Sequence, residues 1–176
     1  MALIMVGPVV KIDPKTLPQY TNIHYLGMKA YDDLPDYLGG WDAAMLPFSL
    51  NDSTRFISPT KTPEYLAAGL PVVSTPIADV IGPYGDLGLV SIAAGAEQFS
   101  EAIAYALKHG RTRNWNTQVD AFLDTLSWDR TWQQMAELIN QKANGQGLSP
   151  HRGSAQRYER HVDTSNGIEK IECLIT

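Results

Sequence analysis

The sequence predicts an α/β protein in which a parallel sheet is covered by helices on both faces. Short apolar runs, such as residues 2–6 and 72–75, end at Gly or Pro, as is typical of strands buried on both faces. Helical segments follow between these runs, which favours parallel strands joined by crossover helices. After Gly95 the sequence pattern predicts helices and no further strand before the tail.

The first half of the chain alternates predicted strands with loops and short helices. Strands are expected at residues 2–6, 22–26, 43–46, 72–75 and 89–93. Residues 11–20 contain two prolines and predict a loop or one short turn. Asp32 or Asp33 is expected to cap a short helix that Gly39 and Gly40 end. Residues 77–88 are rich in Gly and Pro and are expected to be irregular.

Three amphipathic helices are expected after Gly95. Gly110 ends the first, the second covers residues 115–126, and Ser127 caps the third. From about Gly145 the sequence turns to Gly, Ser, Gln and mixed charges without sustained periodicity. We therefore expect one domain over residues 1–144 and a mobile tail over 145–176, within which residues 168–175 offer an alternative small strand.

Residues 58–76 predict a loop, a short helix, a tight turn and a buried strand in succession. Pro63 suits the first helical turn, and Thr60 or Thr62 can cap it. Gly69 is a helix stop able to take a left-handed conformation, and Pro71 prevents the helix from resuming. The segment thus places a helix start where a loop leaves the sheet.

This helix start has the features of a nucleotide site. Unpaired backbone N–H groups and partial positive charge at a helix N-terminus suit a phosphate, and Lys61 adds a full charge there. Glu64 lies about one turn further on, where its carboxylate could accept hydrogen bonds from the vicinal hydroxyls of a ribose. Lys61 and Glu64 are also the candidates for catalytic roles.

The residues Ser-Pro-Thr-Lys-x-x-Glu-Tyr-Leu-Ala-Ala-Gly-x-Pro-Val-Val-Ser-Thr, at 58–75, resemble the nucleotide-sugar-binding motif of GT-B glycosyltransferases. The branch is the group 1, or GT4-like, branch. The resemblance covers roughly residues 3–139 and is weak outside the motif. It implies a Rossmann-like C-terminal donor domain, in which Glu64 binds the ribose. The diphosphate would be bound by Ser58, Pro59, Thr60 and Lys61.

One position departs from the family pattern. Many members have a glutamate near the transferred sugar, eight residues before Glu64, and this chain has Phe56 there. The resemblance suggests retention of anomeric configuration, but Phe56 leaves the sugar and the catalytic detail open. Met28 and Lys29 follow the second strand, where the family's base-contacting loop lies. Arg55 either clamps a phosphate or is a surface charge.

Composition and residue spacing argue against several kinds of binding partner, among them nucleic acids and metal ions. The net charge of −5 argues against a nucleic-acid surface. The single cysteine, Cys173, excludes an internal disulfide framework and is consistent with a reducing compartment. No apolar run is long enough to span a bilayer. We expect a cytoplasmic protein, either free or peripheral to a membrane, and no dedicated metal site, because no cluster of ligands has suitable spacing.

Three functions remain open on the sequence. The first is a glycosyltransferase donor domain that binds a UDP- or GDP-sugar, without any other cofactor, for transfer to a glycan or glycoconjugate acceptor. The second is a binding-only nucleotide module. The third is a UDP-sugar epimerase of the same two-domain architecture, which product analysis with donor alone would distinguish.

The resemblance further implies that the chain begins inside the second domain of a two-domain enzyme. The N-terminal, acceptor-binding domain would then be missing. We expect Leu3, Ile4 and Val6 to be poorly buried, and the chain to self-associate and to turn over no donor by itself.

Overall fold

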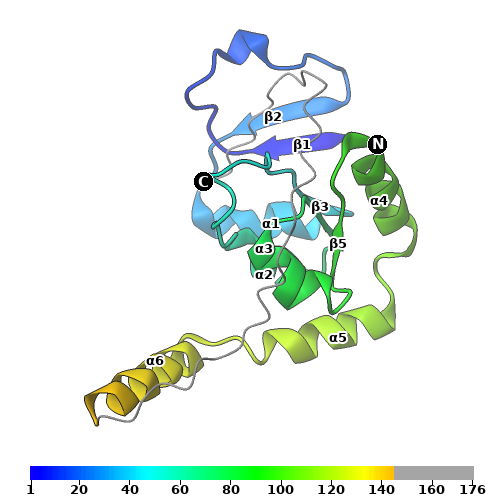
Figure 1. Ribbon diagram of the computed structural model, residues 1–176. Coiled ribbons are helices and arrows are strands. Elements are labelled where there is room, and N and C mark those ends of the chain that lie inside the picture. The colour runs from blue at the N-terminus through cyan, green and yellow to red at the C-terminus, as the bar shows by residue number, and fades with distance from the viewer. Residues whose placement is uncertain (145–176) are drawn as a thin grey trace. The chain divides into compact units, whose positions relative to one another are not determined.

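The computed structural model describes residues 1–144 (Figure 1). The chain divides into two compact units between Asp120 and Ala121, and each is described by itself. The predicted tail and the alternative strand at residues 168–175 lie outside the described residues. No helix in the described part is long and apolar enough to cross a membrane.

Five parallel strands form in the first unit, as the sequence predicts. They are β1 (Leu3–Val6), β2 (Ile23–Gly27), β3 (Ala44–Leu46), β4 (Val72–Ser74) and β5 (Val90–Ile92). Hydrogen bonds divide them between two sheets, one of order β1-β2 and one of order β3-β4-β5. In the second sheet Val73 of β4 lies between Met45 and Ser91 of its neighbours.

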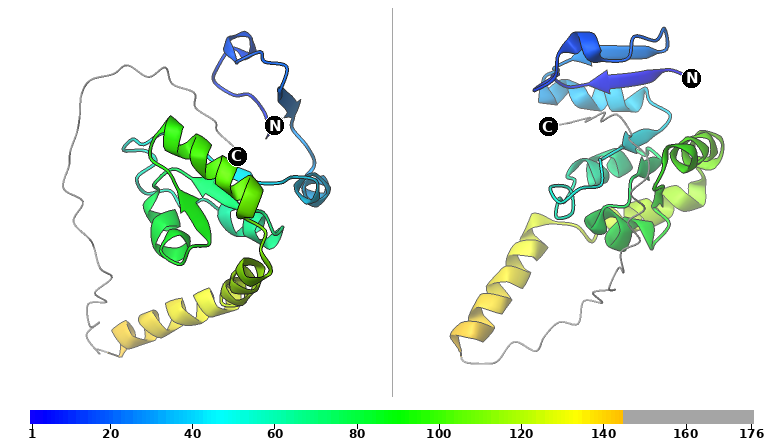
Figure 2. Two further views of the ribbon diagram at one scale, coloured as in Figure 1. Left: turned by 90° about the vertical axis from the view of Figure 1, so that its right-hand side faces the viewer. Right: turned by 45° about the horizontal axis from the view of Figure 1, so that its top comes forward.

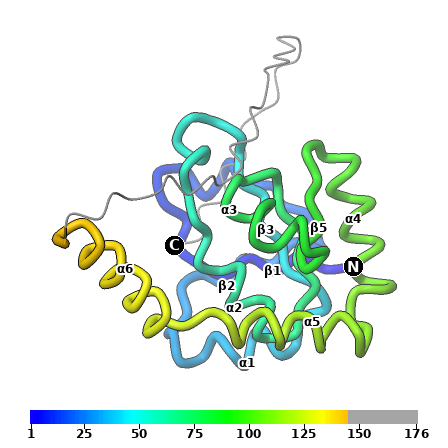
Figure 3. Tube along the Cα trace, turned by 60° about the horizontal axis from the view of Figure 1, so that its bottom comes forward, coloured from blue at the N-terminus to red at the C-terminus, as the bar shows by residue number. Residues whose placement is uncertain are grey.

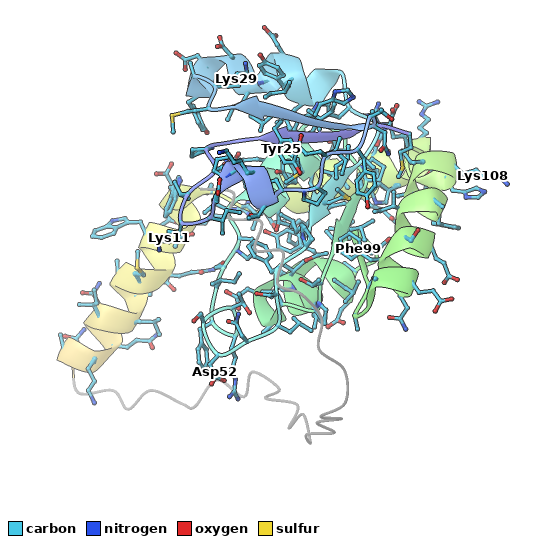
Figure 4. The ribbon with its side chains drawn as sticks, turned by 90° about the horizontal axis from the view of Figure 1, so that it is seen from above. Lys11, Tyr25, Lys29, Asp52, Phe99 and Lys108 are labelled. Atoms are coloured by element: carbon cyan, nitrogen blue, oxygen red, sulfur yellow. The ribbon has the colours of Figure 1, made fainter. Side chains whose placement is uncertain are left out.

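The core of the first unit is built around β4. Val73 is fully buried and packs with Ala93 and Ala106, and around them lie the partly buried Phe99 and Ile103. Three of these residues belong to α4 (Ala96–His109), which contacts both β4 and β5 (Figure 2). Figure 4 shows Phe99 on the side of α4 that faces the strands.

The first sheet is less protected than the second. All four residues of β1 are only partly buried, whereas all three residues of β4 are buried. The burial of Leu3, Ile4 and Val6 thus falls between the poor burial expected from the sequence and the closed core around β4. The hydroxyl of Tyr25 on β2 donates a hydrogen bond to the Pro18 carbonyl at 3.1 Å, tying the preceding loop to this sheet (Figure 4).

The connections are helical more often than the sequence predicts. In the first 95 residues they are η1 (Pro14–Thr16), η2 (Tyr31–Asp33), α1 (Leu34–Gly39), α2 (Lys61–Ala67), α3 (Ala78–Val80) and η3 (Ile81–Gly85). The prediction that residues 77–88 are irregular is therefore wrong. Ile77 and Val80 are buried, and their burial holds this segment in successive turns despite its glycines and Pro83.

Two predicted helix caps are wrong. Asp33 and Thr60 occupy the positions before α1 and α2, but each has helical backbone angles and neither side chain makes a capping hydrogen bond. A true cap has an extended backbone, which lets the side-chain oxygen reach the helix N–H groups. A helical turn precedes α1 directly, because η2 runs into it. Gly69, in contrast, takes the predicted left-handed conformation, with φ of 68°.

The remaining helices follow the predicted periodicity. After α4 the chain forms α5 (Arg113–Leu123), in which Val119 is buried, and then α6 (Trp128–Ala143). The hydroxyl of Ser127 accepts a hydrogen bond from the backbone N–H of Arg130 at 3.1 Å, which confirms the predicted cap of α6.

Candidate functional site

The helix α2 presents two different faces. Thr62, Tyr65 and Leu66 are buried, with at most 6% of each residue exposed. Lys61 and Glu64 of the same helix are only partly buried. The helix follows the loop after β3 and ends in the turn at Gly69 before β4, so its first turn lies near the carboxyl ends of these strands (Figure 3). This is the edge where ligands bind in parallel α/β sheets.

Lys61 and Glu64 form an ion pair on the first turn of α2. The Lys61 Nζ atom lies 2.8 Å from the Glu64 Oε2 atom, and the two side chains are 21% and 32% exposed. The structure thus brings together the two residues predicted to bind the diphosphate and the ribose. A three-residue spacing on a helix allows such a pair at little cost in strain.

A pocket of about 370 Å³ opens beside Glu64. One wall comes from Glu64 and Ala67 of α2 and from Ala68, which follows the helix directly. The other comes from η2 and α1, and contributes Tyr31, Leu34, Pro35, Leu38 and Gly39. The pocket is therefore mostly apolar with one carboxylate at its side, and its volume is within the usual range for small-molecule sites, about 300–1,000 Å³.

Lys61 also contacts the aromatic ring at the rim of this pocket. Its Nζ atom lies 5.8 Å from the centroid of the Tyr31 ring, within the range of a cation–π interaction. The ammonium group therefore touches both an acid and an aromatic face. Tyr31, Lys61 and Glu64 form one contiguous group of side chains, which we call the α2 cluster.

The buried face of α2 carries two polar side chains, those of Tyr65 and Thr62. Burial raises the pKa of Tyr65 above its ordinary value of 10.0, and the neighbouring Glu64 carboxylate raises that pKa further. The Tyr65 phenol is therefore neutral at physiological pH. Beside it, the Thr62 hydroxyl is buried and makes no hydrogen bond within the described part of the chain.

The other predicted site residues occupy loops near α2 and β2. Ser58, Pro59 and Thr60 form the end of the loop that leads into α2, and the Pro59 carbonyl accepts a hydrogen bond from the Thr62 N–H at 3.1 Å. The Arg55 guanidinium lies 5.3 Å from the ring centroid of its neighbour Phe56, which is 82% exposed. The structure therefore pairs Arg55 with its neighbour Phe56, and the choice between a phosphate clamp and a surface charge stays a prediction.

Met28 and Lys29 come directly after β2, at the positive-φ residue Gly27. Met28 is 73% exposed, and the Lys29 ammonium lies 5.5 Å from the ring centroid of Tyr37 on α1 (Figure 4). Neither residue lines the pocket beside Glu64. Their assignment to a base-contacting loop stays a prediction.

Sequence reasoning missed the wall of the pocket that η2 and α1 provide. The sequence predicts a short helix in this segment but gives Tyr31 no role in a site. One signal in the sequence could have pointed to it. Tyr31 is an aromatic residue directly before Asp32 and Asp33, and the sequence predicts no packing role for it. Within residues 1–144, no three His, Cys, Asp or Glu side chains gather so as to hold a metal ion.

Comparison with solved structures identifies a similar fold. One match is to the crystal structure of WaaG, a glycosyltransferase involved in lipopolysaccharide biosynthesis, with a TM-score of 0.54 and 20% sequence identity. The aligned part covers 78% of this chain and 38% of the WaaG chain. This likeness confirms the Rossmann-like architecture predicted for one half of a GT-B enzyme. A comparison with curated proteins gives no significant match.

Comparison with protein families shows which family this chain belongs to. The family described as glycosyl transferases group 1 matches residues 1–109, which is more than half of the chain. The match includes every residue of the α2 cluster and all five strands. The chain belongs to the group 1 family of glycosyl transferases.

Proposed function

We propose that this chain binds a nucleoside-diphosphate sugar at the α2 cluster and serves as the donor domain of a glycosyltransferase. The observation that supports the proposal most is the Lys61–Glu64 pair beside a pocket of about 370 Å³. An ammonium, a carboxylate and an apolar pocket in contact suit the phosphate, the ribose hydroxyls and the base of one ligand. Family membership supports the same ligand class.

Each residue has a distinct part in the proposed reaction. The bond between the sugar's anomeric carbon and the phosphate oxygen breaks, and negative charge gathers on the departing diphosphate. The acceptor's hydroxyl oxygen forms the new bond to that carbon, and its proton passes to the diphosphate. Lys61 stabilises that charge at a partly buried position, where electrostatic interactions are stronger than in water. Glu64 accepts hydrogen bonds from the ribose hydroxyls and fixes the nucleotide. Ser58, Pro59 and Thr60 shape the diphosphate side of the site. Hexose transfer with retention of configuration is what the family resemblance suggests.

Two alternative functions, a binding-only module and an epimerase, would use the same site. A binding-only module would hold the nucleotide without transfer, and the chain covers only 38% of the WaaG chain. A complete transferase would therefore need an acceptor-binding domain, which we propose as the partner. Glycosyltransferase family membership favours transfer over epimerisation.

Titration calorimetry tests the donor site directly. We expect the chain to bind UDP or GDP in the millimolar range or tighter, and to bind the nucleosides uridine and guanosine more weakly because they lack the charge that Lys61 neutralises. Absence of binding by any nucleoside diphosphate at millimolar concentration would refute the site. A turnover assay with the chain alone and with a longer version including an N-terminal domain then separates binding from transfer.

A further inference from the structure

The helix α6 exposes a continuous apolar face. No residue of this helix is buried by the described part of the chain. Trp128, Trp132, Met135 and Ile139 recur at spacings of four and three residues, which places them on one side of the helix, and Leu138 borders them. These five side chains, which we call the α6 face, are between 45% and 87% exposed. Single exposed apolar residues are ordinary, but a contiguous set marks a contact surface.

The charges on the rest of α6 favour a protein partner over a membrane. The helix contains two acids and two bases, Asp129, Glu137, Arg130 and Lys142, so its net charge is zero. Helices that lie on a membrane surface are usually rich in Lys and Arg, which anionic lipids attract. The whole chain has a net charge of −5, which also disfavours an anionic surface. The α6 face therefore suits another apolar protein surface.

A second copy of α6 that runs in the opposite direction fits this face in size. An antiparallel pair centred between Met135 and Ala136 places Trp132 level with Ile139 of the other copy, and Trp128 level with Ala143. Each tryptophan thus lies opposite a smaller side chain, whereas a parallel pair would set tryptophan against tryptophan. Alternation of large and small side chains lets packed helices interdigitate without voids.

The charges distinguish the same two arrangements. In the antiparallel pair, Asp129 near the start of one helix comes level with Lys142 near the end of the other, and Arg130 and Glu137 come level with uncharged residues. In a parallel pair, each of these charges would come level with its own copy. Like charges at short range are destabilising and opposite charges are weakly stabilising. Both size and charge therefore favour the antiparallel pair.

We propose that two copies of this chain pair through the α6 face, with the two helices antiparallel and the tryptophans at the centre of the contact. An aromatic ring buries about 150–250 Å², so the four tryptophans of a pair account for on the order of 600–1,000 Å². A specific interface needs about 1,000 Å² in total, and the aliphatic residues of the α6 face add to the sum. The pairing gives the self-association expected from the sequence a defined surface, separate from the donor site.

Sedimentation equilibrium compares the parent chain with the double variant Trp128→Gln/Trp132→Gln. The parent is expected to be a dimer at micromolar concentrations, and the variant should dissociate at least about 30-fold more readily, as the loss of a central interface side chain does. Tyr20→Gln is the matched control, because Tyr20 is 67% exposed and belongs to the first unit, and it should dimerise as the parent does. Circular dichroism checks that each variant keeps its helices.

Disulfide cross-linking tests the direction of the helices. In a Cys173→Ser background, Met135→Cys places a thiol beside the midpoint of the antiparallel pair, within reach of the same thiol on the other copy. Ala143→Cys places the two thiols near opposite ends, about 22 Å apart along the helix axis. Oxidation should therefore yield a covalent dimer of Met135→Cys and none of Ala143→Cys.

The other outcomes would overturn the pairing. A monomeric parent would do so, and if it floated with phosphatidylcholine vesicles while the tryptophan variant did not, the α6 face would belong to a membrane. A dimer that the tryptophan variant retained in full would place the contact elsewhere. Covalent dimers of both cysteine variants would indicate parallel helices, and of neither, no contact through α6. If a longer version with an N-terminal domain were monomeric, that domain would be the occupant of the face.

Discussion

The Lys61 ammonium and the Glu64 carboxylate lie 2.8 Å apart on the first turn of α2, so the two groups proposed to hold opposite parts of a nucleotide neutralise each other in the structure. A pair of partly exposed charges contributes only about 0–1 kcal/mol to stability. Its loss should therefore affect ligand binding far more than folding, which makes the pair accessible to mutation.

Glu64→Ala should weaken UDP or GDP binding while the fold stays intact. A lost charge-assisted hydrogen bond costs about 1.5–3 kcal/mol, or roughly 10- to 150-fold in the dissociation constant. The matched control is Glu97→Ala, because Glu97 is an exposed acid in the first turn of α4. Calorimetry measures both variants. Equal affinities of Glu64→Ala and the parent would refute the ribose assignment.

Lys61→Met should weaken binding of inorganic pyrophosphate as well as of UDP, because it removes the charge assigned to the diphosphate. The unfolding free energy should change by less than about 1 kcal/mol, as expected for a partly exposed ion pair. Lys15→Met, an exposed lysine on η1, is the control and should leave both ligands unaffected. Pyrophosphate binding that survives in Lys61→Met would exclude this lysine from the phosphate site.

Thr62→Val should stabilise the protein. The Thr62 hydroxyl is fully buried and has no hydrogen-bond partner within residues 1–144, while valine has nearly the same shape without the polar atom. Relief of an unpaired buried polar group raises the unfolding free energy by about 1–3 kcal/mol. Urea denaturation measures the change. A loss of stability would indicate that the hydroxyl finds a partner in solution, such as a bound water.

Gly110→Ala should destabilise the fold. A Cβ atom at Gly110 would lie 2.3 Å from Cγ of Pro71 and 2.5 Å from the Ala106 carbonyl oxygen, closer than atoms can approach. Overpacking of this kind costs about 1–3 kcal/mol. Gly82→Ala is the control, since nothing lies within 4 Å of a Cβ there and its φ is not positive. Thermal unfolding should show a lower midpoint for Gly110→Ala alone.

Alkaline pH should destabilise the protein through Tyr65. Burial raises the pKa of this phenol in the folded state above the ordinary value of 10.0, and Glu64 adds to the effect. Above pH 10 the unfolded chain releases the proton while the folded chain retains it, so the unfolding free energy falls as pH rises. In Tyr65→Phe that fall should be shallower in denaturation curves measured from pH 8 to 11. Parallel curves for the variant and the parent would show that Tyr65 does not contribute.

The strands and the principal helices could be predicted from the sequence because their signals are local. Val72 and Val73 form a buried run between Pro71 and Pro76, and β4 occupies the run almost exactly as expected. The motif at residues 58–75 likewise indicated the family, which the match over residues 1–109 confirms. Gly69 could be assigned because few residues other than glycine tolerate its backbone conformation.

The parts that escaped prediction depend on contacts between distant segments. The turns at residues 78–85 form because Ile77 and Val80 are buried, although the local glycines favour irregular structure. Tyr31 lines the pocket with Glu64 only because η2 and α2 lie next to each other in the fold. Similarly, the caps at Asp33 and Thr60 were predicted from residue type, whereas the backbone there is already helical.

The division of the strands between two ladders has a consequence for hydrogen–deuterium exchange. Backbone amides of β4 are enclosed by a partner strand on each side and by a buried core, whereas β1 and β2 form a two-stranded ladder with partly exposed side chains. Two-stranded pairs are marginally stable by themselves, and segments with little buried area open most readily. The amides of β1 and β2 should therefore exchange through local opening, long before those of β4 exchange by global unfolding.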